Sequence, residues 1–69
     1  MSKRKEKFAK SLSMFLKPKG VTTLLANYLE VDTAAVCNWK SGKSFPEAET
    51  VIKIAEFFNC SVDAILGRE

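Results

Sequence analysis

The chain has 69 residues, of which 46% are hydrophobic and 28% are charged, with a net charge of +3 and no histidine. This length suits one domain, and a domain this small buries only about 60% of the surface that its unfolded chain exposes, so its core must be compact. The longest apolar run is far shorter than the roughly 20 residues that a membrane-spanning helix needs. The basic start is not followed by the apolar run of a secretory signal peptide, so we expect a cytoplasmic protein.

A first helix is predicted before Pro18 and Gly20, which disfavour its continuation. Its apolar residues recur with helical spacing on one face: Phe8, Leu12, Phe15 and Leu16. A short second helix is predicted from Thr22 or Thr23 to Leu29, because threonine can cap the free N–H groups of a first turn. Its inward residues are Leu25, Ala26 and Leu29.

A third helix is predicted over residues 33–40, after a turn too short for any other element. Asp32 is a suitable N-cap for it, and Gly42 suits the left-handed conformation that ends a helix. Val36 and Trp39 are spaced i, i+3 and face inward. We therefore interpret Trp39 as a core residue and not as a side chain that stacks on a base.

Ser44 and Glu47 have the spacing of a capping box, which predicts the start of a fourth helix. The expected inward face of this helix consists of Ala48, Val51, Ile52, Ala55 and Phe58. Asn59 ends it, Ser61 caps a last short helix, and Gly67 ends the pattern. The inner residues of the last helix are Val62, Ile65 and Leu66. The fold class is therefore predicted to be all-α, with five helices.

The second and third predicted helices have the features of a helix-turn-helix, two short helices joined by a three-to-four-residue turn. Ala26 is small enough for the two helices to cross closely. The apolar residues that would lock them together are Leu25, Leu29, Val31, Val36 and Trp39. Small or polar residues remain for the outer face of the third helix: Thr33, Ala34, Cys37 and Asn38. This pattern indicates a unit that reads DNA.

Two stretches of the chain resemble the Cro/repressor-type helix-turn-helix family. They read Leu25-Ala26-x-x-Leu29-x-Val31-Asp32 with Val36-x-x-Trp39-x-x-Gly42-Lys43, and Pro46-x-x-Glu49-Thr50-Val51-Ile52-Lys53-Ile54-Ala55 with Cys60-Ser61-Val62-Asp63-x-Ile65-Leu66. The resemblance extends over residues 5–67. It implies a compact five-helix domain, with the helix-turn-helix as its second and third helices, that binds double-stranded DNA, commonly as a homodimer on a two-fold symmetric operator.

The resemblance also implies roles for individual residues. The third helix becomes the recognition helix, and its base-contacting positions fall on Thr33, Ala34 and Asn38. Cys37 is a near neighbour of these positions and is expected to contact bases with them. The phosphate-contacting positions fall on Thr22 and Lys43, and we expect Thr23 and Lys40 to contact phosphates as well. The chain departs from the family at three points: Thr22 replaces the usual glutamine, Glu30 replaces the usual glycine of the turn, and the loop before the second helix is one residue shorter than in the commonest family form. We therefore expect Glu30 to have a positive φ, at a cost of about 1 kcal/mol.

The recognition helix lacks arginine and glutamine, which make bidentate contacts to guanine and adenine. Asn38 can pair with adenine N6 and N7, and Ala34, the Thr33 methyl and the Cys37 sulfur can pack on a thymine methyl. The sequence thus predicts A·T-rich contacted positions, with further selectivity from DNA shape.

Charge is divided unevenly along the chain. Residues 1–20 contain seven Lys or Arg and one acidic residue, and residues 44–69 contain two basic and five acidic residues. A basic end is typical of a polyanion-binding protein, although a solvated tail gives the same pattern. Within a single domain over residues 1–69, we expect residues 1–6 to form a flexible basic arm, which either follows DNA or is frayed.

Other functions have less support. The chain has no histidine or glycine-rich phosphate loop, so we expect no enzyme activity, metal, cofactor or small-molecule ligand. With no export signal, Cys37 and Cys60 are expected to be reduced thiols, and a redox role for Cys37 is the lesser alternative. Phe45 and Phe57 belong either to the core or to a dimer interface. The alternative function is a protein-interaction module, an antitoxin or an antagonist of a larger regulator, which the acidic second half favours.

Overall fold

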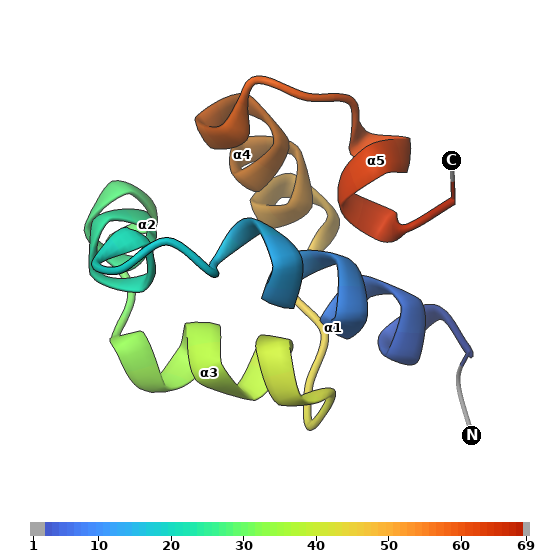
Figure 1. The fold of residues 1–69 in the computed structure, drawn as a ribbon, viewed down its shortest axis with the longest axis horizontal. Helices are drawn as coiled ribbons and strands as arrows, with labels where there is room; N and C mark the ends of the chain where they lie inside the picture. The colour runs from blue at the N-terminus through green and yellow to red at the C-terminus, as the bar shows by residue number, and fades with distance from the viewer. Residues whose placement is uncertain (1–2, 69) are drawn as a thin grey trace.

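A computed structural model describes residues 3–68 of the chain, with side chains from residue 5 onward (Figure 1). Over these residues it is all-helical, as predicted. The helices are α1 (Lys3–Phe15), α2 (Val21–Leu29), α3 (Thr33–Ser41), α4 (Ala48–Phe58) and α5 (Val62–Leu66). None of the helices within this range has both the length and the apolar character needed to cross a membrane.

The expected basic arm lies only partly within the described residues. The backbone of residues 3–6 belongs to the first turns of α1. Residues 1 and 2 and the side chains of Lys3 and Arg4 lie outside the described part of the structure.

Helix α1 lies at the centre of the arrangement, packed against α3 on one side and α5 on the other (Figure 1). Helix α2 contacts α3 and α4, and α4 contacts α5. Because α1 contacts both α3 and α5, it connects the helix-turn-helix to the C-terminal half of the domain.

Every helix contributes a fully buried side chain to one core. These side chains are Phe8 and Leu12 of α1, Leu25 of α2, Val36 of α3, Ile54 of α4 and Ile65 of α5. Trp39 is 8% exposed and belongs to the same cluster, which confirms its assignment to the core. Each such side chain stabilises the fold by about 1.5–3 kcal/mol relative to its exposed state.

The predicted inward face of α4 was wrong at two positions. Ile52 is 50% exposed and Ala48 is exposed, whereas Ile54 is fully buried. The buried stripe is Val51, Ile54 and Ala55, at i, i+3 and i+4. Ile52 lies about 100° around the helix from Val51, so it reaches only the edge of this stripe. The prediction failed because two isoleucines compete for one face and their spacing alone did not decide between them.

The predicted capping box at Ser44 was also wrong. Helix α4 begins at Ala48, and its N-cap is Glu47, whose side chain makes no cap hydrogen bond. Pro46 disfavours helical geometry at Phe45. The ring of Phe45 instead packs edge-to-face on Phe8, with centroids 5.1 Å apart. This contact holds the α3–α4 connection against α1. Helix α4 therefore begins three residues later than it would with Ser44 as its N-cap.

The predicted start of α2 was late. The helix begins at Val21, its N-cap is Gly20 with φ 85°, and no side chain caps it. The threonines therefore lie inside the first turn. In contrast, Ser61 caps α5 as predicted, because its Oγ accepts a hydrogen bond from the Ala64 N–H at 3.0 Å.

Helices α2 to α5 all end in the same left-handed turn. The residues just past their ends, Glu30, Gly42, Asn59 and Gly67, all have positive φ. In each turn, the following N–H donates to a carbonyl five residues earlier, as in a Schellman motif. This confirms the expected ends at Gly42 and Gly67 and the positive φ expected of Glu30, which is 60°.

Phe45 and Phe57 both pack against the core and are only partly buried. Phe57 contacts the Tyr28 ring at 5.2 Å and the Phe58 ring at 4.9 Å between centroids. Of the two interpretations left open by the sequence, core packing therefore accounts for both residues.

Candidate nucleic-acid interface

Helices α2 and α3 are held together by the turn between them and by small and apolar side chains. The Val31 N–H donates to the Ala26 carbonyl at 3.0 Å, which fixes the direction in which the chain leaves α2. Ala26 is 2% exposed, and its short side chain allows the two helices to pack closely. The sequence-predicted pair of short helices is therefore present with the expected small residue at its crossing.

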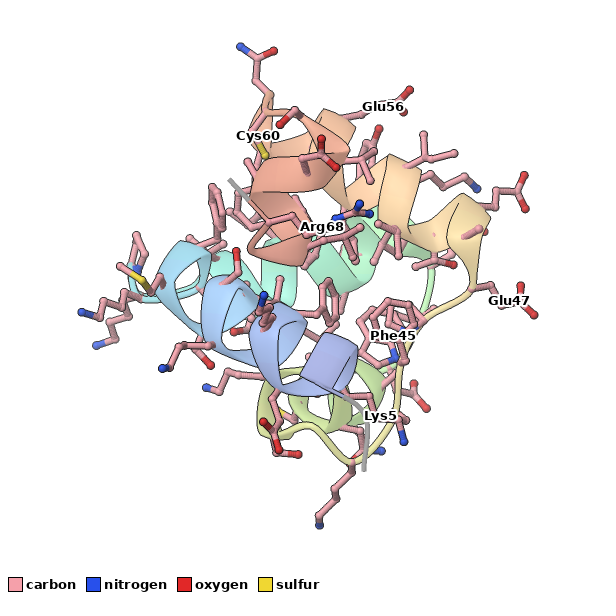
Figure 2. The ribbon with its side chains drawn as sticks, turned by 90° about the vertical axis from the view of Figure 1, so that its right-hand side faces the viewer. Lys5, Phe45, Glu47, Glu56, Cys60 and Arg68 are labelled. Carbon is pink, nitrogen blue, oxygen red and sulfur yellow. The ribbon has the colours of Figure 1, made fainter. Side chains whose placement is uncertain are left out.

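Helix α3 has one buried side and one solvent-exposed side. Val36 and Trp39 are buried, and the helix lies at the edge of the molecule, at the bottom of both Figure 1 and Figure 2. The four residues predicted to contact bases are all exposed: Thr33, Ala34, Cys37 and Asn38. The structure thus brings these four residues together on a surface where another molecule can reach them. We call the exposed side of α3 the recognition face.

Ser41 also belongs to this face, although it was not predicted from the sequence. Ser41 is exposed, and it is the last residue of α3, one residue beyond the predicted end. It follows Ala34 and Asn38 at i+7 and i+3, which places it on their side of the helix. Its Oγ donates to the Asn38 carbonyl at 3.1 Å, so its oxygen faces the surroundings as an acceptor. The helical spacing was the signal that could have revealed it.

The C-terminal end of α3 carries the two predicted phosphate-contacting lysines. Lys40 and Lys43 are both exposed, in the last turn of α3 and just beyond Gly42. The Lys43 N–H donates to the Asn38 carbonyl at 2.9 Å, which fixes the backbone that carries this lysine. The Ser13 Oγ of α1 donates to the Lys40 carbonyl at 3.4 Å and attaches α1 to the same end of α3.

Thr22 and Thr23 lie in the first turn of α2, where the backbone N–H groups have no partner within the helix. Thr23 is exposed and Thr22 is half-buried. The N-terminal end of a helix attracts anions through these N–H groups and through the helix dipole. Both threonines are thus available to an anion, with Thr23 the more accessible.

Charge in the structure is divided between two parts of the domain. Exposed lysines lie on α1 and in the connection that follows it: Lys7, Lys10, Lys17 and Lys19. With Lys40 and Lys43, they place positive charge on the part of the domain that contains α1 and α3. Fewer exposed acidic residues lie in this part: Glu6 on α1, and Glu30 and Asp32 just before α3. On and beside α4 and α5, the exposed acidic residues Glu47, Glu49, Glu56 and Asp63 outnumber the exposed basic residues Lys53 and Arg68. The side that carries the recognition face is therefore the basic one.

Comparison with known proteins agrees with this geometry. The model of a family described as the bacteriophage CI repressor helix-turn-helix domain matches residues 20–69, which include α2 to α5. The HTH-type transcriptional activator BcrR of Enterococcus faecalis is 38% identical over 45 residues, which cover 65% of this chain and 22% of that protein. This chain thus spans less than a quarter of the length of that relative. No solved structure matches the present chain significantly.

Proposed function

The chain belongs to the bacteriophage CI repressor helix-turn-helix family, and on this premise we propose that it binds double-stranded DNA in a sequence-specific manner and regulates transcription. The observation that carries the proposal is the recognition face of α3, whose exposed small and polar side chains lie opposite the buried Val36 and Trp39. A helix anchored in this way can enter the major groove without losing core contacts.

Base selection in this proposal depends mainly on Asn38. Its side chain is exposed, and its amide can offer one donor and one acceptor to an adenine edge. Ala34, Thr33 and Cys37 offer apolar atoms that pack on thymine methyl groups. The contacted base pairs are therefore A·T-rich, and the remaining selectivity comes from DNA shape.

Phosphate contacts position the recognition helix in the groove. Lys40 and Lys43 lie at the C-terminal end of α3, and Thr22 and Thr23 lie at the start of α2. Lysines that neutralise phosphates release counterions, so binding weakens as salt rises. These four residues supply affinity and orientation, whereas the recognition face supplies the choice of sequence.

One recognition helix reads only a few base pairs, so the regulator acts as a two-fold dimer. Its half-sites would lie about 10–10.5 bp apart, or at multiples of this spacing, which corresponds to one turn of DNA. The two recognition helices then face the same side of the duplex.

The same fold could instead bind a protein, as an antitoxin or an antagonist of a larger regulator. The exposed acidic residues of α4 and α5 favour this second function, because they would repel DNA and attract a basic partner. They lie on different helices from the recognition face, so the two functions make separable predictions.

Binding of the chain to a random duplex pool, with selection and sequencing of the bound DNA, separates the two. The DNA-binding function predicts that an A·T-rich motif with two-fold symmetry is enriched. It also predicts that the logarithm of the binding constant falls linearly with the logarithm of the salt concentration. No binding to duplex DNA at low salt would reject this function and leave the protein-interaction module.

A further inference from the structure

Helices α1 and α5 pack against each other, and two adjacent hollows open along their contact (Figure 1). The first hollow, of about 280 Å³, is lined by residues of α1 and by small residues at the C-terminal end of the chain: Lys7, Lys10, Ser11, Met14, Ala64 and Gly67. The second hollow, of about 270 Å³, is lined by Ser11, Met14 and Phe15. Because the two hollows share Ser11 and Met14, they form one groove, which we call the α1–α5 groove.

Direct contacts between the two helices fix the walls of the groove. The Ser11 Oγ donates a hydrogen bond to the Ala64 carbonyl at 2.8 Å. Beyond the end of α5, a Cβ atom on Gly67 would lie only 2.9 Å from the Lys7 carbonyl oxygen, so the two backbones are in contact there. The groove is therefore formed in the free protein, and a partner does not have to open it. Such preorganisation lowers the cost of binding.

The groove combines an exposed apolar side chain with positive charge. Met14 is 65% exposed, the largest value for any large hydrophobic side chain among the described residues. Methionine is flexible and adapts its shape to different apolar partners. Lys7 and Lys10 are exposed, and no carboxylate of the described residues forms an ion pair with either of them. The acidic neighbours of the lining residues in the sequence, Glu6 and Asp63, line neither hollow. The groove thus presents an apolar surface bordered by two cations that lack an anionic partner.

The length of the groove and the spacing of its hollows fit a helix. The α1 wall runs from Lys7 to Phe15, which is about 12 Å at 1.5 Å per residue. The α1 residues of the second hollow lie about one helical turn further along α1 than those of the first, so the two hollows are offset by roughly 5 Å. Side chains at positions i and i+4 of a helix are separated by about the same distance. A helix that lies along α1 therefore places one apolar side chain in each hollow, which is a common way of binding a helix in a groove.

We propose that the α1–α5 groove binds an acidic amphipathic helix of another protein. Apolar side chains of that helix at i and i+4 pack on Met14 in the two hollows, and carboxylates beside them pair with Lys7 and Lys10. Apolar burial supplies the attraction, and charge complementarity selects the partner. The phosphates of DNA would pair with the lysines but would leave Met14 without an apolar partner. The lining residues belong to α1 and to the end of the chain and not to α3, so the proposal goes beyond DNA binding and is tested without an operator.

Three fluorescent peptides of about 16 residues, a length at which alanine-rich sequences form helices in water, test the proposal. All three carry leucines at i and i+4, and they differ only in whether the residues beside the leucines are glutamate, glutamine or lysine. We expect fluorescence anisotropy to show that the wild type binds the glutamate peptide about 10-fold more tightly than the glutamine peptide, and the lysine peptide most weakly. In NMR spectra, the glutamate peptide should shift the amide signals of the residues that line the groove.

The double variant Lys7→Glu with Lys10→Glu tests the charge complementarity. It should bind the glutamate peptide about 10-fold more weakly than the wild type does, and it should prefer the lysine peptide, because the charge of the rim is reversed. Unfolding would not produce this new preference. The matched control is Lys19→Glu with Lys53→Glu, which changes the net charge equally at exposed positions outside the groove. At physiological salt, which screens distant charges, its affinity for the glutamate peptide should change by less than about 3-fold.

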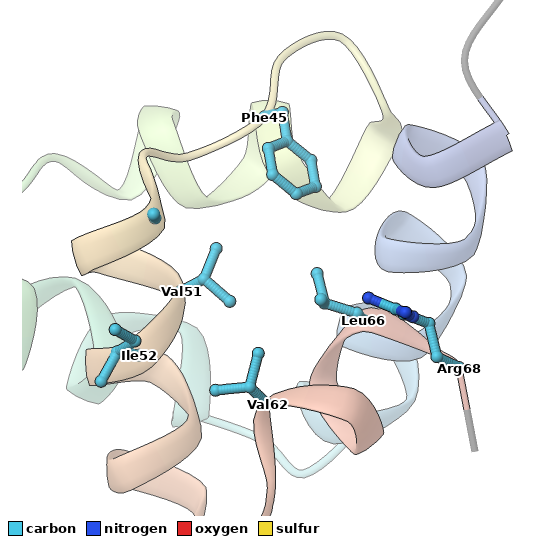
Figure 3. A pocket seen from close by; sticks show the side chains of 7 residues that line it. Phe45, Val51, Ile52, Val62, Leu66 and Arg68 are labelled. Atoms are coloured by element: carbon cyan, nitrogen blue, oxygen red, sulfur yellow. The ribbon is translucent and has the colours of Figure 1, made fainter.

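The proposal would be overturned if the wild type bound no peptide up to about 1 mM, or bound all three equally. It would also be overturned if the NMR shifts fell on the separate hollow between α4 and α5, at Ile52, Val62 and Leu66, instead of on the groove (Figure 3). Three further results would identify a different occupant of the groove. Shifts of its residues with random-sequence duplex DNA alone would indicate nucleic acid, shifts with phosphatidylglycerol vesicles alone would indicate a lipid surface, and shifts that depend only on protein concentration would indicate a second copy. Loss of DNA binding would leave the peptide results unchanged, so failure of the proposed function is distinguishable.

Discussion

Glu30 and Asn59 occupy equivalent positions in two turns, each as the first residue past a helix and each with a left-handed backbone, at φ 60° and 55°. The two residues differ in how well they tolerate this conformation. Asparagine visits the left-handed region readily, whereas glutamate is strained there. The turn of the helix-turn-helix therefore stores strain that the turn after α4 largely avoids.

Replacing Glu30 with glycine should relieve this strain. We expect Glu30→Gly to raise the free energy of unfolding by about 0.5–1 kcal/mol, a gain in left-handed geometry partly offset by the greater freedom of glycine in the unfolded chain. This corresponds to a rise in melting temperature of several degrees for a domain of this size. Asn59→Gly is the matched control, and its effect should be close to zero. Equal effects in thermal unfolding would contradict the difference in strain.

Trp39 should be essential for folding. Its side chain is 8% exposed and joins the core shared by all five helices, so Trp39→Ala should cost about 3–5 kcal/mol. This approaches the whole stability of a small domain, and circular dichroism should show a largely unfolded protein. Lys40→Ala, at the exposed neighbouring position, should unfold like the wild type. A folded Trp39→Ala variant that only loses DNA binding would contradict the packing role.

Two serines near the starts of α4 and α5 should differ in how much they contribute to stability. The Ser61 Oγ accepts a hydrogen bond from the Ala64 N–H at 3.0 Å, so Ser61→Ala should cost about 1 kcal/mol of stability. Ser44 does not cap α4, whose N-cap is Glu47, so Ser44→Ala should change stability by less than about 0.5 kcal/mol. Chemical denaturation of both variants tests this. A larger loss of stability for Ser44→Ala would contradict this and would support the capping box predicted from the sequence.

Much of the fold followed from the sequence because apolar spacing decides which face of a helix is buried. The spacing of Phe8 and Leu12, of Leu25 and Ala26, and of Val36 and Trp39 was enough. It was not enough for α4, where Ile52 and Ile54 are both suitable core residues. Contacts between helices determine which of the two isoleucines is buried, and these contacts cannot be inferred from a single sequence.

The exposure of the candidate site residues was predicted to a similar degree, and their contacts with DNA stay a prediction. The four exposed residues of the recognition face were identified from the outward positions of α3 and from the family resemblance. Ser41 was missed because the predicted helix stopped at Lys40, one residue short of the observed end. The apolar hollow between α4 and α5, lined by Ile52, Val62 and Leu66, could not be predicted, because it depends on Ile52 lying outside the core.

The most direct test of the central claim compares Asn38→Ala with Lys43→Ala in sequence selection and in salt-dependent binding. Loss of a bidentate base contact should cost about 1–3 kcal/mol and remove the preference at one base pair of the selected motif. Loss of a phosphate contact should leave the motif intact and reduce the slope of log K against log salt by about 0.9. We predict the first result for Asn38→Ala and the second for Lys43→Ala. If both variants bind the selected DNA and random DNA as the wild type does, α3 is not a recognition helix.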